Sequence, residues 1–167
     1  MLKQVALFGG AKPYSETPGD SALSSRQVEH GDVVVFATDG VWDNLSAEDA
    51  LRLVSRLMAR LGAWVEPTSD SPSSGPVPPN FLEIMHTAEI KVPSTSASTQ
   101  EPDTPVKGLA SVLATALTHE AKVASLDRKR DGPFAREVQR LYPEENWRGG
   151  KADDICVVVG VVCRDGG

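Results

Sequence analysis

The sequence predicts an α+β protein with antiparallel strands, and two kinds of pattern support this fold class. Two short apolar runs, residues 33–38 and 155–162, are typical of buried strands. Between them, residues 46–61 and 105–125 place apolar side chains at the spacing of amphipathic helices. The 167 residues suit one modest domain or part of a larger one.

Composition and charge exclude several classes of protein. The net charge of −6 argues against a nucleic-acid partner, which usually meets a basic surface. No apolar stretch approaches the roughly 20 residues of a membrane span. Cys156 and Cys163 lie in one predicted strand, about 20 Å apart, so we expect two free thiols rather than a disulfide.

The first predicted strands precede and include the apolar run at 33–38. Residues 3–8 and 27–29 could each form a short strand, and His30-Gly31 would turn the second into a strand at 32–38. Because residues 33–37 are apolar on both faces, we expect this strand to be buried and central.

A helix is predicted to begin after Ser46, which is a good N-cap, and to stop at Gly62. Glu48 and Asp49 lie in its first turn, where the helix dipole favours acids. The apolar residues of its predicted stripe are Ala50, Leu51, Val54, Leu57, Met58 and Leu61.

Residues 66–105 are rich in Pro, Ser and Thr, which predicts a disordered insertion within the domain, with 81–85 as a short ordered segment. Thr104 and Pro105 would then cap and open the helix at 105–125. A third, short helix is predicted at 133–141. Gly149-Gly150 turns the chain toward the final strand.

Acidic residues stand at the ends of the two apolar strands. Asp39 directly follows the strand at 33–38, and Asp153 and Asp154 directly precede the strand at 155–162. If the two strands lie antiparallel, these acids reach the same edge of the sheet.

Two interpretations of these acids stay open. Asp39-Gly40 after a strand is most often a turn, and Asp153 could be a solvated acid with Lys151 as its partner. Asp43, four residues after Asp39, favours a functional site. Carboxylates that converge from two loops suit Mg²⁺ or Mn²⁺, and two such ions can activate a water for attack on phosphorus. This pattern suggests metal-assisted phosphoester hydrolysis.

Other catalytic chemistries have little support. His30, His86 and His119 are scattered, so a zinc site is not expected. Position 162, six residues after Cys156, is valine and not the arginine of a cysteine phosphatase.

Two segments resemble motifs of the PPM-type, or type 2C, serine/threonine protein phosphatases. Residues 37–45, Ala-Thr-Asp-Gly-Val-Trp-Asp-Asn-Leu, resemble the C-terminal metal motif of that family, and residues 150–155 resemble its last motif. Residues 133–135 and 149–151 resemble the subgroup often found in mitochondria and plastids. The resemblance implies a β-sandwich with helices on both outer faces, in α-β-β-α layers, and metal-dependent hydrolysis of phosphoserine and phosphothreonine in proteins.

The resemblance also implies roles for individual residues. Asp39 and Asp153 would be ligands of a centre of two Mn²⁺ or Mg²⁺ ions, and Asp43 would lie near a third, weaker ion. The metal-activated water would be the nucleophile, with no further catalytic side chain. The residues expected to support the ligands are Gly40, Asn44 and Asp154.

One part of the family pattern is missing. The N-terminal half of these phosphatases supplies a further Asp-Gly pair whose Asp bridges both metals, and neither Asp131-Gly132 nor Asp165-Gly166 fits that motif. Residues 1–167 therefore resemble a single partial domain, the C-terminal half of such a phosphatase, with the N-terminal part missing.

Three interpretations of this half-domain follow. The first is that it belongs to an enzyme, and that the half-domain alone has low activity. The second is that it is a non-catalytic pseudophosphatase or regulatory module. The third is that it is a truncated gene product. A phosphoprotein substrate is the expected partner, with a separate N-terminal half as a further candidate. The subgroup resemblance points to mitochondria, with the cytoplasm as the alternative.

Overall fold

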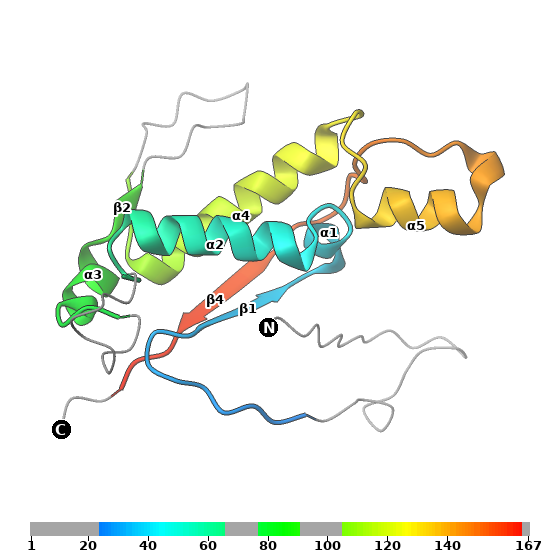
Figure 1. The fold of residues 1–167 in the computed structure, drawn as a ribbon. Helices are drawn as coiled ribbons and strands as arrows, with labels where there is room; N and C mark the ends of the chain where they lie inside the picture. The colour runs from blue at the N-terminus through cyan, green and yellow to red at the C-terminus, as the bar shows by residue number, and fades with distance from the viewer. Residues whose placement is uncertain (1–23, 66–76, 91–104, 165–167) are drawn as a thin grey trace, which may run out of the picture.

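A computed structural model describes residues 24–65, 77–90 and 105–164. Within these residues the chain forms helices and two small antiparallel sheets, which confirms the α+β class (Figure 1). The helices are α1 (Asp39–Trp42), α2 (Ala47–Arg60), α3 (Phe81–Thr87), α4 (Leu109–Leu126), α5 (Pro133–Leu141) and the 3-10 helix η2 (Pro143–Glu145). The strands are β1 (Val33–Ala37), β2 (Glu89–Ile90), β3 (Val106–Lys107) and β4 (Val157–Val161).

The pairing of β1 with β4 brings the two ends of the described chain together. The strands are antiparallel, with Val33 opposite Val161 and Ala37 opposite Val157. The end of β1 and the start of β4 therefore lie together at the same end of the sheet, as the sequence predicts.

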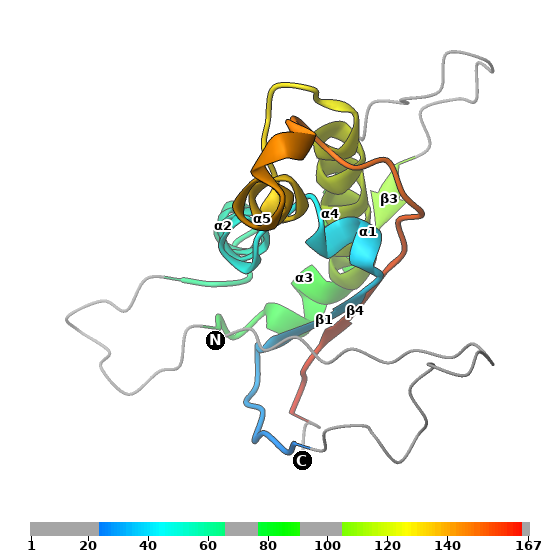
Figure 2. The same ribbon diagram turned by 90° about the vertical axis from the view of Figure 1, so that its right-hand side faces the viewer.

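One face of this sheet is covered by helices. Figures 1 and 2 show α4 lying across the sheet with α2 beside it. The buried face of α4 places apolar residues at helical spacing against the strands and α2. The buried residues of α4 are Leu109, Val112, Leu113, Leu117, Ala121, Ala124 and Ser125.

The other face of the β1–β4 sheet is open among the described residues. Phe36 is 62% exposed and Val158 is 59% exposed. The prediction that 33–37 is buried on both faces is therefore wrong for this structure, because no described element covers that second face. The pattern of exposure is that of a sheet packed on one side only.

The predicted helix at 46–61 is confirmed as α2. Ser46 Oγ accepts the backbone N–H of Asp49, and the Asp49 carboxylate accepts that of Ser46, which makes a capping box. Gly62 has a φ of +71°, as expected just past a helix end. Leu51 is 47% exposed, contrary to the predicted stripe, because it points about 100° away from the buried Ala50 around the helix.

Residues 77–90 form part of the folded core. Phe81, at the start of α3, is only 1% exposed. Its ring packs edge-to-face against the His30 ring, with 4.9 Å between the ring centroids. The short ordered segment expected at 81–85 is thus present and extends to Thr87, although the range 66–105 is predicted as a disordered insertion. The predicted strand at 3–8 and residues 66–76 and 91–104 of the predicted insertion lie outside the described residues.

Three predicted boundaries differ from the structure. Residues 27–29 form no strand, because Glu29 instead turns back and donates its N–H to the Asp32 carboxylate at 2.8 Å. The helix predicted from Pro105 begins at Leu109, since Val106–Lys107 pairs with β2. The last strand begins at Val157 rather than 155, because the Cys156 N–H donates to the Thr38 hydroxyl.

The third predicted helix and the two cysteines can also be compared with the structure. The third helix is confirmed as α5, with a proline in its first turn. Cys156 and Cys163 are both free thiols. Among the described helices, none combines the length and the apolar character that a membrane span requires.

Candidate metal centre

The candidate site begins where β1 ends. After Thr38 the chain enters α1 at once, so Asp39-Gly40 starts a helical turn rather than a hairpin. Val41 and Leu45, 0% and 1% exposed, anchor this turn under α4. Residues four apart lie on one face of a helix, which places the carboxylates of Asp39 and Asp43 on the same side.

Gly40 allows the second segment of the site to approach α1. A Cβ at this position would lie 2.4 Å from the Asp154 carbonyl oxygen and 3.1 Å from the Asp153 Cβ. Real Cβ atoms essentially never make contacts under 3.0 Å. Glycine is therefore required here for close backbone approach, and the expectation that Gly40 supports the site has a physical basis.

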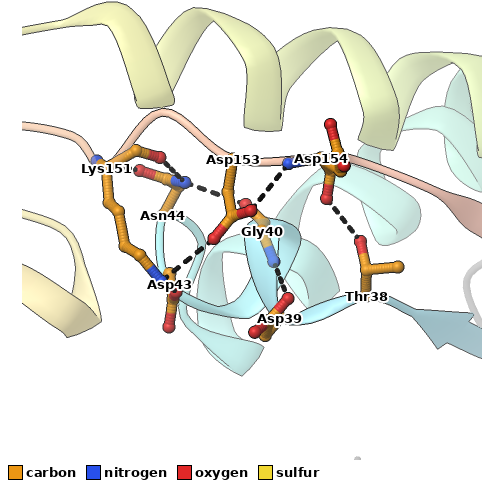
Figure 3. Close-up of polar contacts among 8 residues, drawn as sticks. All are labelled: Thr38, Asp39, Gly40, Asp43, Asn44, Lys151, Asp153 and Asp154. Atoms are coloured by element: carbon orange, nitrogen blue, oxygen red, sulfur yellow. Dashed lines mark hydrogen bonds and ion pairs between the residues drawn. The ribbon is translucent and has the colours of Figure 1, made fainter. Parts of the chain in front are cut away.

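Asn44 joins the same two segments by hydrogen bonds. Its side chain is 1% exposed. Its Nδ2 donates to the carbonyls of Gly40 and Lys151, each at 2.8 Å, and its Oδ1 accepts the Lys151 N–H at 2.9 Å (Figure 3). One buried amide thus fixes the position of Lys151 relative to α1.

Thr38 provides a second link across the strand ends. Its hydroxyl donates to the Asp154 carbonyl at 2.9 Å (Figure 3). The same hydroxyl accepts the Cys156 N–H at 3.0 Å. The sequence pattern does not single out Thr38, because a threonine at the end of a strand is common and its partners are more than 100 residues away.

Three carboxylates converge at this point. Asp39, Asp43 and Asp153 each offer an oxygen, and these oxygens lie within 4.8 Å of one another. Carboxylate oxygens are the ligands that Mg²⁺ and Mn²⁺ prefer, so the donor set fits such an ion. The sequence predicts these three residues as ligands, and the structure brings them together. Asp154 contributes through its backbone carbonyl and lies outside the three-carboxylate group.

Lys151 also lies in this group. Its Nζ is 2.6 Å from Asp43 Oδ2 and 3.0 Å from Asp153 Oδ2. Hydrogen bonds to Asp43 and then Asp153 raise the pKa of Lys151 to about 12, against an opposing effect of burial. The hydrogen bond from Lys151 is also the main cause that lowers the pKa of Asp153. Lys151 thus pairs with Asp153, as one interpretation of the sequence expects. The three acids also converge, as the other interpretation expects.

The start of α5 closes one side of the site. The Phe134 N–H donates to the Asp43 carbonyl at 3.0 Å, and Lys151 Nζ lies 4.7 Å from the centre of the Phe134 ring. Trp147 packs edge-to-face on Phe134, with 5.2 Å between the ring centroids. In the sequence, only the subgroup resemblance of residues 133–135 connects Phe134 with the site.

Comparisons with known proteins bear on the fold. No family model matches the chain, and no curated protein matches it by sequence. The chain is similar to the X-ray structure of the photosystem II phosphatase PBCP, with a TM-score of 0.51 and 18% sequence identity. The match covers 90% of this chain and 44% of that phosphatase, so the chain spans less than half of the phosphatase's length. The fold of this chain is therefore similar to part of the fold of that protein.

Proposed function

We propose that this chain holds one side of a divalent-metal centre for the hydrolysis of phosphoserine and phosphothreonine in proteins. The observation that carries the proposal is the convergence of Asp39, Asp43 and Asp153 at one edge of the sheet. The similarity of the fold to part of a solved phosphatase supports it.

In this proposal Asp39 and Asp153 hold Mn²⁺ or Mg²⁺, and Asp43 serves a further, weaker ion. A bound ion would supply Lewis acidity and charge neutralisation for attack of water on phosphorus. The protein's own part is to hold the carboxylates in place before the ion arrives. Gly40 and Asn44 do so by fixing the distance between α1 and the segment at 151–154.

Titration of the chain with Mn²⁺ in a calorimeter tests the metal centre. We expect saturable binding that is lost or weakened by at least about tenfold in Asp39→Asn, because this change removes a ligand charge but keeps the side-chain shape. Asp32→Asn, at an acid outside the three-carboxylate group, is the matched control. Equal binding by the wild type and Asp39→Asn would contradict the proposal.

A phosphopeptide assay with Mn²⁺ tests whether the chain holds only one side of the centre. The chain spans less than half of the similar phosphatase, so we expect little or no turnover by the chain alone. Rapid turnover by the chain alone, abolished in Asp39→Asn, would show that the centre is complete.

A second candidate function is that of a non-catalytic module that binds a partner. The observation that favours it is the open face of the β1–β4 sheet, where Phe36 and Val158 are exposed. The partner we propose is a polypeptide that presents a complementary apolar sheet face, such as the N-terminal half implied by the family resemblance. Tight binding of such a half by a chain that fails to bind Mn²⁺ would favour this function over hydrolysis.

A further inference from the structure

The ammonium group of Lys151 lies among the carboxylates that would hold a metal ion. It contacts Asp43 and Asp153 directly, whereas Asp39 Oδ1 accepts the N–H of Gly40 (Figure 3). Three carboxylates and one ammonium leave the cluster with an excess of negative charge. Lys151 thus offsets only part of the repulsion among these acids.

The backbone and the side chain of Lys151 are held differently. Asn44 binds both the N–H and the carbonyl of Lys151, and the preceding Gly150 is packed against α4. A Cβ at Gly150 would lie 2.1 Å from the Ala124 carbonyl oxygen, so the backbone here packs directly against α4. The side chain is 28% exposed and ends on four flexible carbons. The ammonium can therefore swing away while its backbone stays in place.

We propose that Lys151 is a tethered counter-ion of the centre, which competes with divalent cations for Asp43 and Asp153 and leaves these carboxylates when the cations bind. This inference rests on the proposed metal centre. The physical reason is that an ammonium within 3.0 Å of these carboxylate oxygens occupies the positions that a cation would take. The two positive charges would also repel each other strongly at such short range.

Competition of this kind has a consequence for affinity. The form of the site that is free of the ammonium is the one that binds the ion, so the observed affinity is reduced by the fraction of time that Lys151 occupies the carboxylates. Removal of the ammonium should therefore strengthen metal binding. A purely structural role for Lys151 predicts the opposite, since loss of a supporting contact weakens a site.

The test is calorimetric titration of the full chain with Mn²⁺ alone, for the wild type and Lys151→Met. Methionine keeps an unbranched apolar side chain beside Phe134 but removes the charge. We expect Lys151→Met to bind Mn²⁺ at least about tenfold more tightly than the wild type. Lys129→Met is the matched control, because it removes the same charge from an exposed residue outside the cluster. We expect it to change the affinity by less than about twofold.

Thermal unfolding supplies a second readout that does not depend on activity. Without metal, Lys151→Met should have a lower Tm than the wild type, because the three carboxylates lose their counter-ion. Saturating Mn²⁺ should raise the Tm of Lys151→Met by more than it raises that of the wild type. Lys151→Gln is expected to behave in the same way and replaces Lys151→Met if the latter does not fold.

The outcomes separate this inference from the proposed function. Mn²⁺ binding by the wild type that Asp39→Asn abolishes, together with equal or weaker binding by Lys151→Met, overturns the competition and leaves the metal centre standing. Absence of Mn²⁺ binding in the wild type and in both Lys151 variants overturns the metal centre and the inference with it. Binding by Lys151→Met alone supports both.

Discussion

At the scale of single residues, the candidate metal centre depends on two residues that are not themselves proposed metal ligands. Asn44 satisfies backbone groups of two segments at once, and Gly40 leaves space for the second segment to approach. Both residues act on Asp153 by positioning its backbone. Their substitution should therefore change stability and metal binding together.

The first prediction concerns Asn44→Ala. Loss of the amide leaves backbone groups of the buried Gly40 and the partly buried Lys151 without these partners, which should cost about 1–3 kcal/mol of stability. Urea denaturation followed by circular dichroism measures the change. Asn80→Ala is the control, because Asn80 is exposed and makes no capping hydrogen bond. Equal stability of the two variants would contradict the role given to Asn44.

The second prediction compares two glycines. Gly40→Ala forces a Cβ against the Asp154 carbonyl and should cost about 1–3 kcal/mol, with weaker Mn²⁺ binding. Gly160→Ala, in β4, meets nothing within 4 Å and should be neutral or stabilising by up to about 1 kcal/mol. Denaturation midpoints of the two variants give the comparison. A Gly40→Ala protein as stable as Gly160→Ala would contradict the need for a glycine at position 40.

At the scale of elements, the site is an outcome of how α1, α2 and β4 begin and end. The short α1 has one turn and depends on Val41 and Leu45 beneath α4 for its position. α2 follows after a capping box, which fixes where this longer helix starts. Stability at the start of α2 therefore supports the loop that carries Asp43.

The third prediction concerns the capping box. Ser46→Ala removes the hydroxyl that accepts the Asp49 N–H and should cost about 1 kcal/mol. Chemical denaturation at pH 7 measures this loss. Ser55→Ala, within α2 at a partly buried position, is the control for loss of a serine hydroxyl away from the helix start. The result would count against the capping box if both variants lost equal stability.

The fourth prediction is a pH dependence that arises from Asp49. The hydrogen bond from Ser46 is the main cause that lowers the pKa of Asp49 below its ordinary value of 3.8. A carboxyl with a lowered folded pKa contributes stability above its unfolded pKa and loses it as pH falls through the folded value. The stability advantage of the wild type over Asp49→Asn should therefore be constant from pH 7 to about 5 and shrink below 3.8. Denaturation curves between about pH 2 and about pH 7, a range that brackets this transition, measure the difference. A difference that does not vary with pH would contradict this assignment.

At the scale of the whole molecule, the described chain is a layered structure with helices on one side of the β1–β4 sheet. Its second face is apolar and open, with Phe36 and Val158 exposed. Both edges of the two-stranded sheet also lack a described neighbour. These features suit a chain that packs against another polypeptide.

The fifth prediction follows from the open face. Phe36→Ser combined with Val158→Thr should reduce self-association of the isolated chain, because the exposed side chains contribute to contact between molecules. Sedimentation velocity at several concentrations measures the association. Unfolding of the monomer should change by less than about 1 kcal/mol, since neither side chain is buried. Leu126→Ser, at an exposed residue at the end of α4, is the control. Equal association of all three proteins would exclude the sheet face as the contact surface.

The fold class, the capped helix α2 and the pair of strands with acids at their ends follow from the sequence alone, because these depend on local periodicity and on residues near each other in the chain. The sequence also points to Asp39, Asp43 and Asp153. The tertiary structure decided what packing controls. It left one face of β1 and β4 open, and it moved the start of α4 to Leu109 by pairing β2 with β3. It also placed Lys151, more than 100 residues away in sequence, against Asp43. Such contacts between distant segments depend on how the helices and strands pack, and no local pattern in the chain encodes them.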